Sequence, residues 1–366
     1  MDISIYLLII VSLILLGLTL LLFLSSIIVR IRHSRWSKKV DQYKKKMMPH
    51  VIHYLEEGDE KEVEAQLSGS KLEYYAFVKI VTEMLSQVEG NDSDKLKELL
   101  FLDPIFDHYF KLLNSKDNVD RVKACNYYSN TRLVNYKVIN KLKDYLNSGN
   151  LMLVFSAASA LMGSEDVKIR IQALHSVSKQ KKISDMALLE LFHKFHSGED
   201  DQNELEAEAL KSILENPDIP PENRALFISG ITEIGYYALV NYLLDRLKDP
   251  GSEWDHPEIL HALIKAQGEF NNTNSVDTIR RYLKHDSPTV IVGAIEELSD
   301  YGSDEDTHEF YSLLLHTNNK VRKAAVFALL KNNELESDIV ASVPEAIQKE
   351  ISKFIMIYKH ESRQNG

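Results

Sequence analysis

Glu190 and His193 have the Glu-x-x-His spacing that di-iron bundles use, and His196 follows one turn later. A di-iron site needs two such motifs together with further carboxylates from other helices. A zinc protease site needs His-Glu-x-x-His, which does not occur in the chain. We therefore expect no metal ion at these residues.

An acidic turn and a single cysteine are the other groups that could carry chemistry. Asp304, Asp306 and His308 lie close together in the sequence, and helix capping accounts for them. Cys125 lies in the helical pattern VDRVKACNYY, where we expect a small buried thiol that packs like an alanine. One cysteine permits no internal disulfide, which is compatible with a reducing compartment.

Motifs for phosphate binding and nucleophilic catalysis do not occur. The patterns GxGxxG, GxxxxGK[ST] and GxSxG are all absent from the sequence. Each of them places backbone amides or a nucleophile where a reaction needs it. We expect a protein that is not an enzyme, with no catalytic residues and no cofactor.

Basic side chains are concentrated in one short segment, which we call the neck. It contains a single acid, Asp41, and these residues: Arg30, Arg32, Arg35, Trp36, Lys38, Lys39, Lys44, Lys45 and Lys46. Basic residues close to a membrane surface are attracted to anionic lipid by about 1 kcal/mol each. We expect the neck to contact lipid headgroups, and the alternative is that its charges act only as a stop-transfer signal.

The run before the neck, residues 3–29, has no charged side chain. Roughly 20 apolar residues cross a hydrocarbon core of about 30 Å, so the run predicts one transmembrane helix. A signal peptide is disfavoured because Asp2 is the only ionisable side chain before the run and no cleavage pattern follows it. The basic neck predicts a single-pass plasma-membrane protein whose N-terminus is outside and whose body is cytoplasmic.

Charge divides the chain sharply. Of its 43 basic and 54 acidic side chains, residues 1–48 hold 8 and 2, which leaves the remaining residues with a net charge of −17. An acidic surface repels nucleic acid and anionic lipid alike. We expect the body to bind a protein and not a nucleic acid.

The body reads as amphipathic helices separated by short loops rich in Asn, Asp, Gly, Ser and Pro, which predicts an all-α fold. We divide the chain into a transmembrane anchor (1–30), a basic juxtamembrane helix (31–58), a helical lead-in or divergent cap (59–111) and a repeat domain (112–366). Pro49 should bend or interrupt the juxtamembrane helix.

Repeated segments carry a family resemblance. A β-branched residue stands four positions before an alanine in several segments, as in Val290 and Ala294. The segment VRKAAVFAL from Val321 resembles the V-R-x-x-A-x-x-A-L core of a HEAT repeat, of the short kind also found in phycobilisome-lyase-type proteins. The segment from Ile169 is the second match, and the resemblance extends over residues 112–332. It implies an armadillo-like α-solenoid, a stack of helix pairs.

Adjacent tyrosines on predicted helices are candidate contacts for a partner. The pairs are Tyr74 and Tyr75, Tyr127 and Tyr128, and Tyr236 and Tyr237. Neighbours on a helix point about 100° apart, so both members of a pair cannot point fully into the core. We expect them to pack between helix layers with the hydroxyl groups reaching water, and the alternative is that one of each pair lies at the edge of a groove.

These features together predict a membrane-anchored scaffold whose cytoplasmic solenoid binds a protein. The layout is also similar to that of bacterial membrane-anchored HEAT proteins, thought to accompany membrane glycosyltransferases that make surface polysaccharide. Phycobilisome-lyase-type proteins imply a bilin-binding or lyase alternative, and some HEAT-like proteins are DNA glycosylases, which the acidic body disfavours. A self-assembling structural protein, packed through Gly17, is the remaining alternative.

Overall fold

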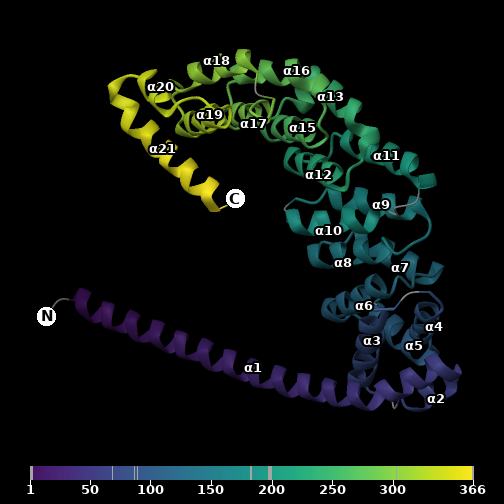
Figure 1. The fold of residues 1–366 in the computed structure, drawn as a ribbon. Helices are drawn as coiled ribbons and strands as arrows, with labels where there is room; N and C mark the ends of the chain where they lie inside the picture. The colour runs from purple at the N-terminus through teal and green to yellow at the C-terminus, as the bar shows by residue number, and fades with distance from the viewer. Residues whose placement is uncertain are drawn as a thin grey trace. The chain divides into compact units, whose positions relative to one another are not determined.

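The computed structural model describes residues 3–67, 69–85, 87–88, 90–181, 184–196, 200–301 and 303–364. Over these residues the fold is all-α, without a strand, as the sequence predicted (Figure 1). The chain forms two compact units, unit 1 from Met1 to Leu133 and unit 2 from Val134 to Gly366.

Helix α1 (Ile3–Glu57) is one continuous helix that contains both the apolar run and the neck. Its helical backbone continues through Pro49, so the expected interruption there is wrong. Proline has no N–H, and the carbonyl of Lys45 therefore lacks its usual helical donor. Met47 and Val51 are buried on the neighbouring turns, and this packing holds the helix together across the missing hydrogen bond.

The two parts of α1 have different surroundings. Large apolar side chains between Ile10 and Val29 are exposed, and Leu22 is 70% exposed. From Val40 onward one face of the same helix is buried through Val40, Met47 and Tyr54. This face packs against α3 and α4. The second half of α1 is therefore part of the core of unit 1.

The rest of unit 1 consists of short helices that follow a tight turn. Gly58 has a φ of +78°, and the Asp59 carboxylate accepts a hydrogen bond from the Lys61 backbone N–H at the start of the next helix. The helices are α2 (Glu60–Ala65), α3 (Lys71–Leu85), α4 (Asn91–Leu100), α5 (Asp103–Leu113) and α6 (Asn118–Thr131). The boundary that we placed at residue 111 falls inside α5, and α5 and α6 group with unit 1.

Unit 2 is built from successive helix pairs. Its helices are α7 (Tyr136–Leu146), α8 (Leu151–Leu161), α9 (Val167–Ser178), α10 (Asp185–Phe195), α11 (Asp200–Leu214), α12 (Pro221–Ile234), α13 (Val240–Lys248), α14 (Gly251–Trp254), α15 (Pro257–Glu269), α16 (Val276–Arg281), α17 (Pro288–Leu298), α18 (Asp304–Leu313), α19 (Asn319–Lys331), α20 (Glu336–Ala341) and α21 (Glu345–Gln364), with 3-10 turns at η1 (Tyr237–Leu239), η2 (Thr273–Ser275) and η3 (Tyr282–Lys284). The second helices of the pairs pack side by side: α10 on α12, α12 on α15, α15 on α17, α17 on α19 and α19 on α21 (Figure 1).

Three loops repeat the same local chemistry. In each loop an Asp or Asn side chain accepts a hydrogen bond from the backbone N–H two residues later, and an Arg four residues later donates to a carbonyl before the helix. The capping residues are Asp117, Asp166 and Asn318, and the arginines are Arg121, Arg170 and Arg322. The repeated geometry explains why sequence self-similarity was visible there.

Cys125 is fully buried in α6, as the sequence predicted. Burial raises the pKa of its thiol to about 12, so almost no thiolate forms near neutral pH. We expect the native protein to react with a thiol reagent such as DTNB more than about a hundredfold more slowly than the denatured protein. Rapid labelling of the native protein at the rate of a free thiol would contradict this burial.

Candidate functional site

Unit 1 contains a pocket of about 530 Å³ between α1, α3, α5 and α6, which we call the aromatic pocket. Its aromatic lining consists of Trp36, Tyr75, His108, Tyr109 and Tyr127. These side chains come from four different helices, so the pocket forms only when the helices of unit 1 pack together. It joins the neck to the helices that follow it.

The aromatic rings form an outer and an inner layer. Trp36 and Tyr75 are 42% and 40% exposed, and their ring centroids lie 4.7 Å apart. Tyr109 and Tyr127 are buried and stack with centroids 3.8 Å apart and an interplanar angle of 4°. The Tyr127 hydroxyl donates a hydrogen bond of 2.7 Å to the Leu100 carbonyl, which fixes its ring. The exposed rings therefore lie at the mouth and the stacked rings form a rigid floor.

Helical spacing places the lining of this pocket. On α3, the lining residues Lys71, Tyr75, Val78, Lys79 and Thr82 recur at the three- and four-residue intervals of one helix face. The core of unit 1 lies against the other face of α3, which carries buried apolar side chains such as Phe77 and Ile80. The two-faced pattern of α3 was visible in the sequence, but which helices would close over the second face was not.

The charged lining of the pocket is mainly basic. It contains Lys71, Lys79 and Lys123 against one acid, Asp120. The Lys123 ammonium lies 3.4 Å from the Asp120 carboxylate, and the Lys79 ammonium lies 3.9 Å from Glu83. This local excess of positive charge contrasts with the acidic body.

His108 adds no charge to the pocket near neutral pH. Burial, together with the nearby Lys71 ammonium, lowers the pKa of the His108 imidazole. The ring lies between Tyr74 and Tyr109, with centroids 4.9 Å and 5.2 Å away. His108 therefore contributes an uncharged ring to the aromatic part of the lining.

The neck residues do not share one environment. Arg30, Arg32, Arg35, Lys38, Lys39, Lys45 and Lys46 are exposed. Lys44 is only partly exposed and forms an ion pair with Glu83 of α3. Trp36, which we expected at the lipid surface, contacts Tyr75 at the mouth of the aromatic pocket. The structure thus gives two of the neck residues partners inside unit 1.

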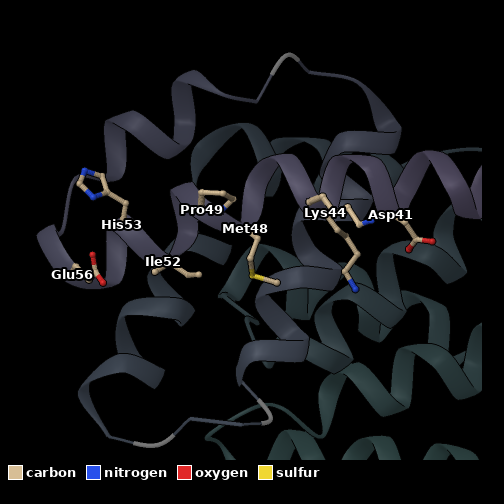
Figure 2. Close-up of a pocket in the computed structure, with 8 residues that line it drawn as sticks. Asp41, Lys44, Met48, Pro49, Ile52, His53 and Glu56 are labelled. Carbon is tan, nitrogen blue, oxygen red and sulfur yellow. The ribbon is translucent and has the colours of Figure 1, made fainter.

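A second depression lies along α1 itself (Figure 2). Figure 2 shows its labelled side chains along one helix: Asp41, Lys44, Met48, Pro49, Ile52, His53 and Glu56. Acidic and basic groups alternate there around a small apolar centre. The His53 ring nitrogen lies 3.3 Å from both Glu57 and Glu62, so this histidine already has acidic neighbours. This strip is open and of mixed charge.

The histidines that the sequence singled out are engaged in separate contacts. His193 Nε2 lies 3.4 Å from Glu233, and Glu190 forms an ion pair of 2.7 Å with Lys194. His196 Nδ1 lies 3.1 Å from the Tyr236 hydroxyl and 3.4 Å from the Glu206 carboxylate. Among the residues that the structure describes, no three His, Cys, Asp or Glu side chains are grouped so that they could hold a metal ion.

Asp306 has a different role from the one the sequence suggested. Its carboxylate is fully buried and accepts a 2.6 Å hydrogen bond from the Arg280 guanidinium. Helix capping does not explain it, so that interpretation is wrong for Asp306. The side chain of Asp304 lies outside the described residues. The ion pair between Arg280 and Asp306 links α16 to α18. The two residues are 26 positions apart in the sequence, so no local pattern indicates their contact.

The tyrosine pairs divide into two kinds. Tyr74 and Tyr236 are buried while their neighbours Tyr75 and Tyr237 are exposed, Tyr237 by 71%, so the expectation that both members of a pair cannot point fully into the core is confirmed for these two pairs. Tyr127 and Tyr128 are both buried, and the expectation is wrong for that pair. Two rings of α5 cover them: Phe106 contacts Tyr128, and Tyr109 stacks on Tyr127.

Glu297 lies in a hollow on the row of second helices in unit 2. Its carboxylate rests against Gly268 of α15, where a Cβ would meet the carboxylate oxygen at 1.5 Å. Burial raises its pKa to about 7; Glu269 and Glu296 also raise it, while Lys265 and Lys331 oppose the shift. The folded protein therefore binds a proton more tightly at this site than the unfolded chain does.

This proton should make the stability of unit 2 fall as the pH rises from about 5 to about 7, because only the folded state retains it in that range. We expect Glu297→Gln to remove this part of the pH dependence. Thermal unfolding at several pH values measures it, and Glu222→Gln, at an exposed position of unit 2, is the matched control. Parallel pH profiles of Glu297→Gln and the unchanged protein would contradict the assignment.

The stacked helix pairs and the repeated cap-and-arginine loops define an α-solenoid. Within it, residues 252–330, which run from α14 to α19, match the family model for HEAT repeats. The match includes the segment from Val321 and confirms the HEAT resemblance for this part of unit 2. No curated protein matches the chain. Solenoids of this kind use their extended surfaces to bind other proteins.

Proposed function

We propose that the protein is a single-pass membrane protein whose HEAT-repeat unit binds a protein partner in the cytoplasm. The observation that carries this proposal is the exposure of the apolar part of α1. No other described helix covers the large side chains between Ile10 and Val29. Removing a side chain such as Leu or Phe from water contributes about 1.5–3 kcal/mol, so a lipid bilayer is a favourable environment for this run.

The continuity of α1 supports an anchor over a signal peptide. The helix that carries the apolar run continues without a break to Val40 and Met47, which are core residues of unit 1. Cleavage would have to fall in the few residues between Val29 and Val40 to leave this core intact. The basic neck on the C-terminal side supports a cytoplasmic body.

The continuous helix also divides the neck by distance. At 1.5 Å per residue, Arg30 to Arg35 lie within about 10 Å of Val29 along the axis, whereas Lys44 lies about 22 Å away. The headgroup layer is only about 5–8 Å thick on each side of the hydrocarbon core. We therefore assign lipid contact to the first arginines and not to Lys44, Lys45 and Lys46.

A partner is best sought with the anchor and both units intact. Affinity purification of the full-length protein in detergent, followed by mass spectrometry, should recover a specific partner, with a membrane glycosyltransferase as one candidate class. A variant that lacks residues 3–29 is the right comparison, because Val40 and Met47 belong to the folded core. Failure of both to enrich any protein would count against the scaffold proposal.

Cross-linking of the protein in membranes distinguishes self-assembly from binding of a different protein. Gly17 has no neighbouring atom within 4 Å where a Cβ would stand, so a second apolar helix could approach it closely. Products made only of this chain would favour a structural assembly over a scaffold. The proposal also includes a non-catalytic role for the protein itself.

A further inference from the structure

We propose that the aromatic pocket of unit 1 binds one anionic membrane lipid, with its phosphate near the lysines and part of its acyl chain on the aromatic rings. This inference rests on the proposed membrane anchor for its source of lipid. The site shares Trp36 with the neck and takes its other lining residues from α3, α5 and α6. Three observations lead to it.

The first observation is the position of the pocket mouth. Trp36 follows Val29 by seven residues on the same unbroken helix, which is about 10 Å along the axis. The headgroup layer extends about 5–8 Å beyond the hydrocarbon core. The exposed pair of Trp36 and Tyr75 therefore lies just beyond the headgroups, where a lipid can reach it by moving outward a short distance.

The second observation is charge. Lys71, Lys79 and Lys123 line the pocket with one acid, Asp120; Lys123 pairs with Asp120, and Lys79 lies 3.9 Å from Glu83, which is outside the lining. Outside residues 1–48 the chain is strongly acidic. A basic site in an acidic body favours an anion and disfavours a zwitterionic or cationic ligand.

The third observation is the apolar lining. Leu72, Val78 and Leu112 line the pocket together with the stacked rings of Tyr109 and Tyr127. A free phosphate would leave this surface in water, whereas an acyl chain covers it. The volume of about 530 Å³ is in the usual range for small-molecule sites, large enough for a headgroup with part of a chain. An amphiphile fits both halves of the site.

Fluorescence of Trp36 gives a direct test. The chain has two tryptophans, so Trp254→Phe leaves Trp36 as the reporter. We would titrate the full-length protein in a zwitterionic detergent with dihexanoyl phosphatidylglycerol, dihexanoyl phosphatidylcholine and glycerol phosphate. We expect a saturable change in emission with the phosphatidylglycerol, at a concentration at least about tenfold lower than for the phosphatidylcholine, and none with glycerol phosphate.

Variants locate the site. Tyr75→Ala and the double change Lys71→Gln with Lys79→Gln should each raise the half-saturating concentration of phosphatidylglycerol about tenfold or more. Tyr237→Ala is the matched control, because Tyr237 is the exposed member of a tyrosine pair in unit 2, and it should change nothing. If Trp254→Phe impairs folding, native mass spectrometry of the protein that retains both tryptophans counts the bound lipid molecules.

Three outcomes would overturn the proposal: equal binding of the two lipids, equally tight binding of glycerol phosphate, or no saturable binding of any probe. The anchor is tested separately, because extraction of the protein from membranes by alkaline carbonate would refute the anchor whatever the pocket binds in detergent. The two failures are therefore distinguishable.

Discussion

Deletion of residues 3–29 is expected to move the protein almost completely from the membrane pellet to the soluble fraction, with the fold of both units retained. The deleted residues are apolar, and the described side chains among them are exposed, so they contribute no packing to the core. The full-length protein should stay in the pellet after washing with high salt and with alkaline carbonate, because a membrane-spanning helix is held by burial of apolar surface. Fractionation with detection of the body gives the measurement.

A longer deletion provides the structural contrast. Removal of residues 3–48 also removes Val40 and Met47, which are each 2% exposed. Loss of a large buried side chain costs about 2–5 kcal/mol, so this variant should unfold unit 1 or aggregate. Circular dichroism melting should separate the two deletions.

The electrostatic part of membrane attachment has its own control. Replacing Arg30, Arg32 and Arg35 by serine leaves the apolar run intact and should not release the protein from the pellet. Release of the full-length protein by salt or carbonate would contradict the membrane-spanning assignment. Digestion of the body by protease added outside right-side-out vesicles would contradict the cytoplasmic orientation.

Arg170→Met is expected to destabilise unit 2 by about 3–5 kcal/mol, which is the usual cost of removing one member of a buried ion pair. The Arg170 guanidinium lies 3.0 Å from the Glu206 carboxylate, and the two side chains are 8% and 0% exposed. Tyr236 also donates a 2.6 Å hydrogen bond to Glu206. Burial and Glu206 raise the pKa of Tyr236, so it remains a neutral donor that cannot replace the arginine charge.

Urea denaturation in a Trp36→Phe background, followed by Trp254 fluorescence, measures this loss, since Trp254 is buried in unit 2. The double change Arg170→Met with Glu206→Leu should recover much of the stability, because it removes both charges together. Lys179→Met is the matched control: Lys179 pairs with Asp218 at the surface, where an ion pair contributes about 0–1 kcal/mol. Equal effects of Arg170→Met and Lys179→Met would refute the importance of burial.

Several features of this chain could be predicted because they are local. Helix periodicity and loop composition are properties of a few consecutive residues, and the predicted loops contain the residues that the structure shows as caps, Asp117, Asp166 and Asn318. The resemblance of VRKAAVFAL to HEAT repeats has the same basis, and the family match over residues 252–330 confirms it there. The burial of Cys125 followed from its apolar neighbours on one helix face.

Other features depend on contacts between distant segments. The continuation of α1 through Pro49 depends on Met47 and Val51 being buried against other helices, which outweighs the missing hydrogen bond. The burial of both Tyr127 and Tyr128 depends on rings supplied by α5. Residue propensities describe single positions, so they predict neither of these contacts.

The sequence by itself determined that this protein is an all-α chain with an apolar N-terminal run, a basic neck and an acidic repeat body, because composition and periodicity are written in neighbouring residues. Only the tertiary structure decided that one face of α1 beside the neck, through Val40 and Met47, packs into the core of unit 1, and that Trp36, Tyr75, Tyr109 and Tyr127 meet in one pocket. The physical reason is that a pocket is formed by side chains from separate helices, and their meeting is decided by how those helices pack.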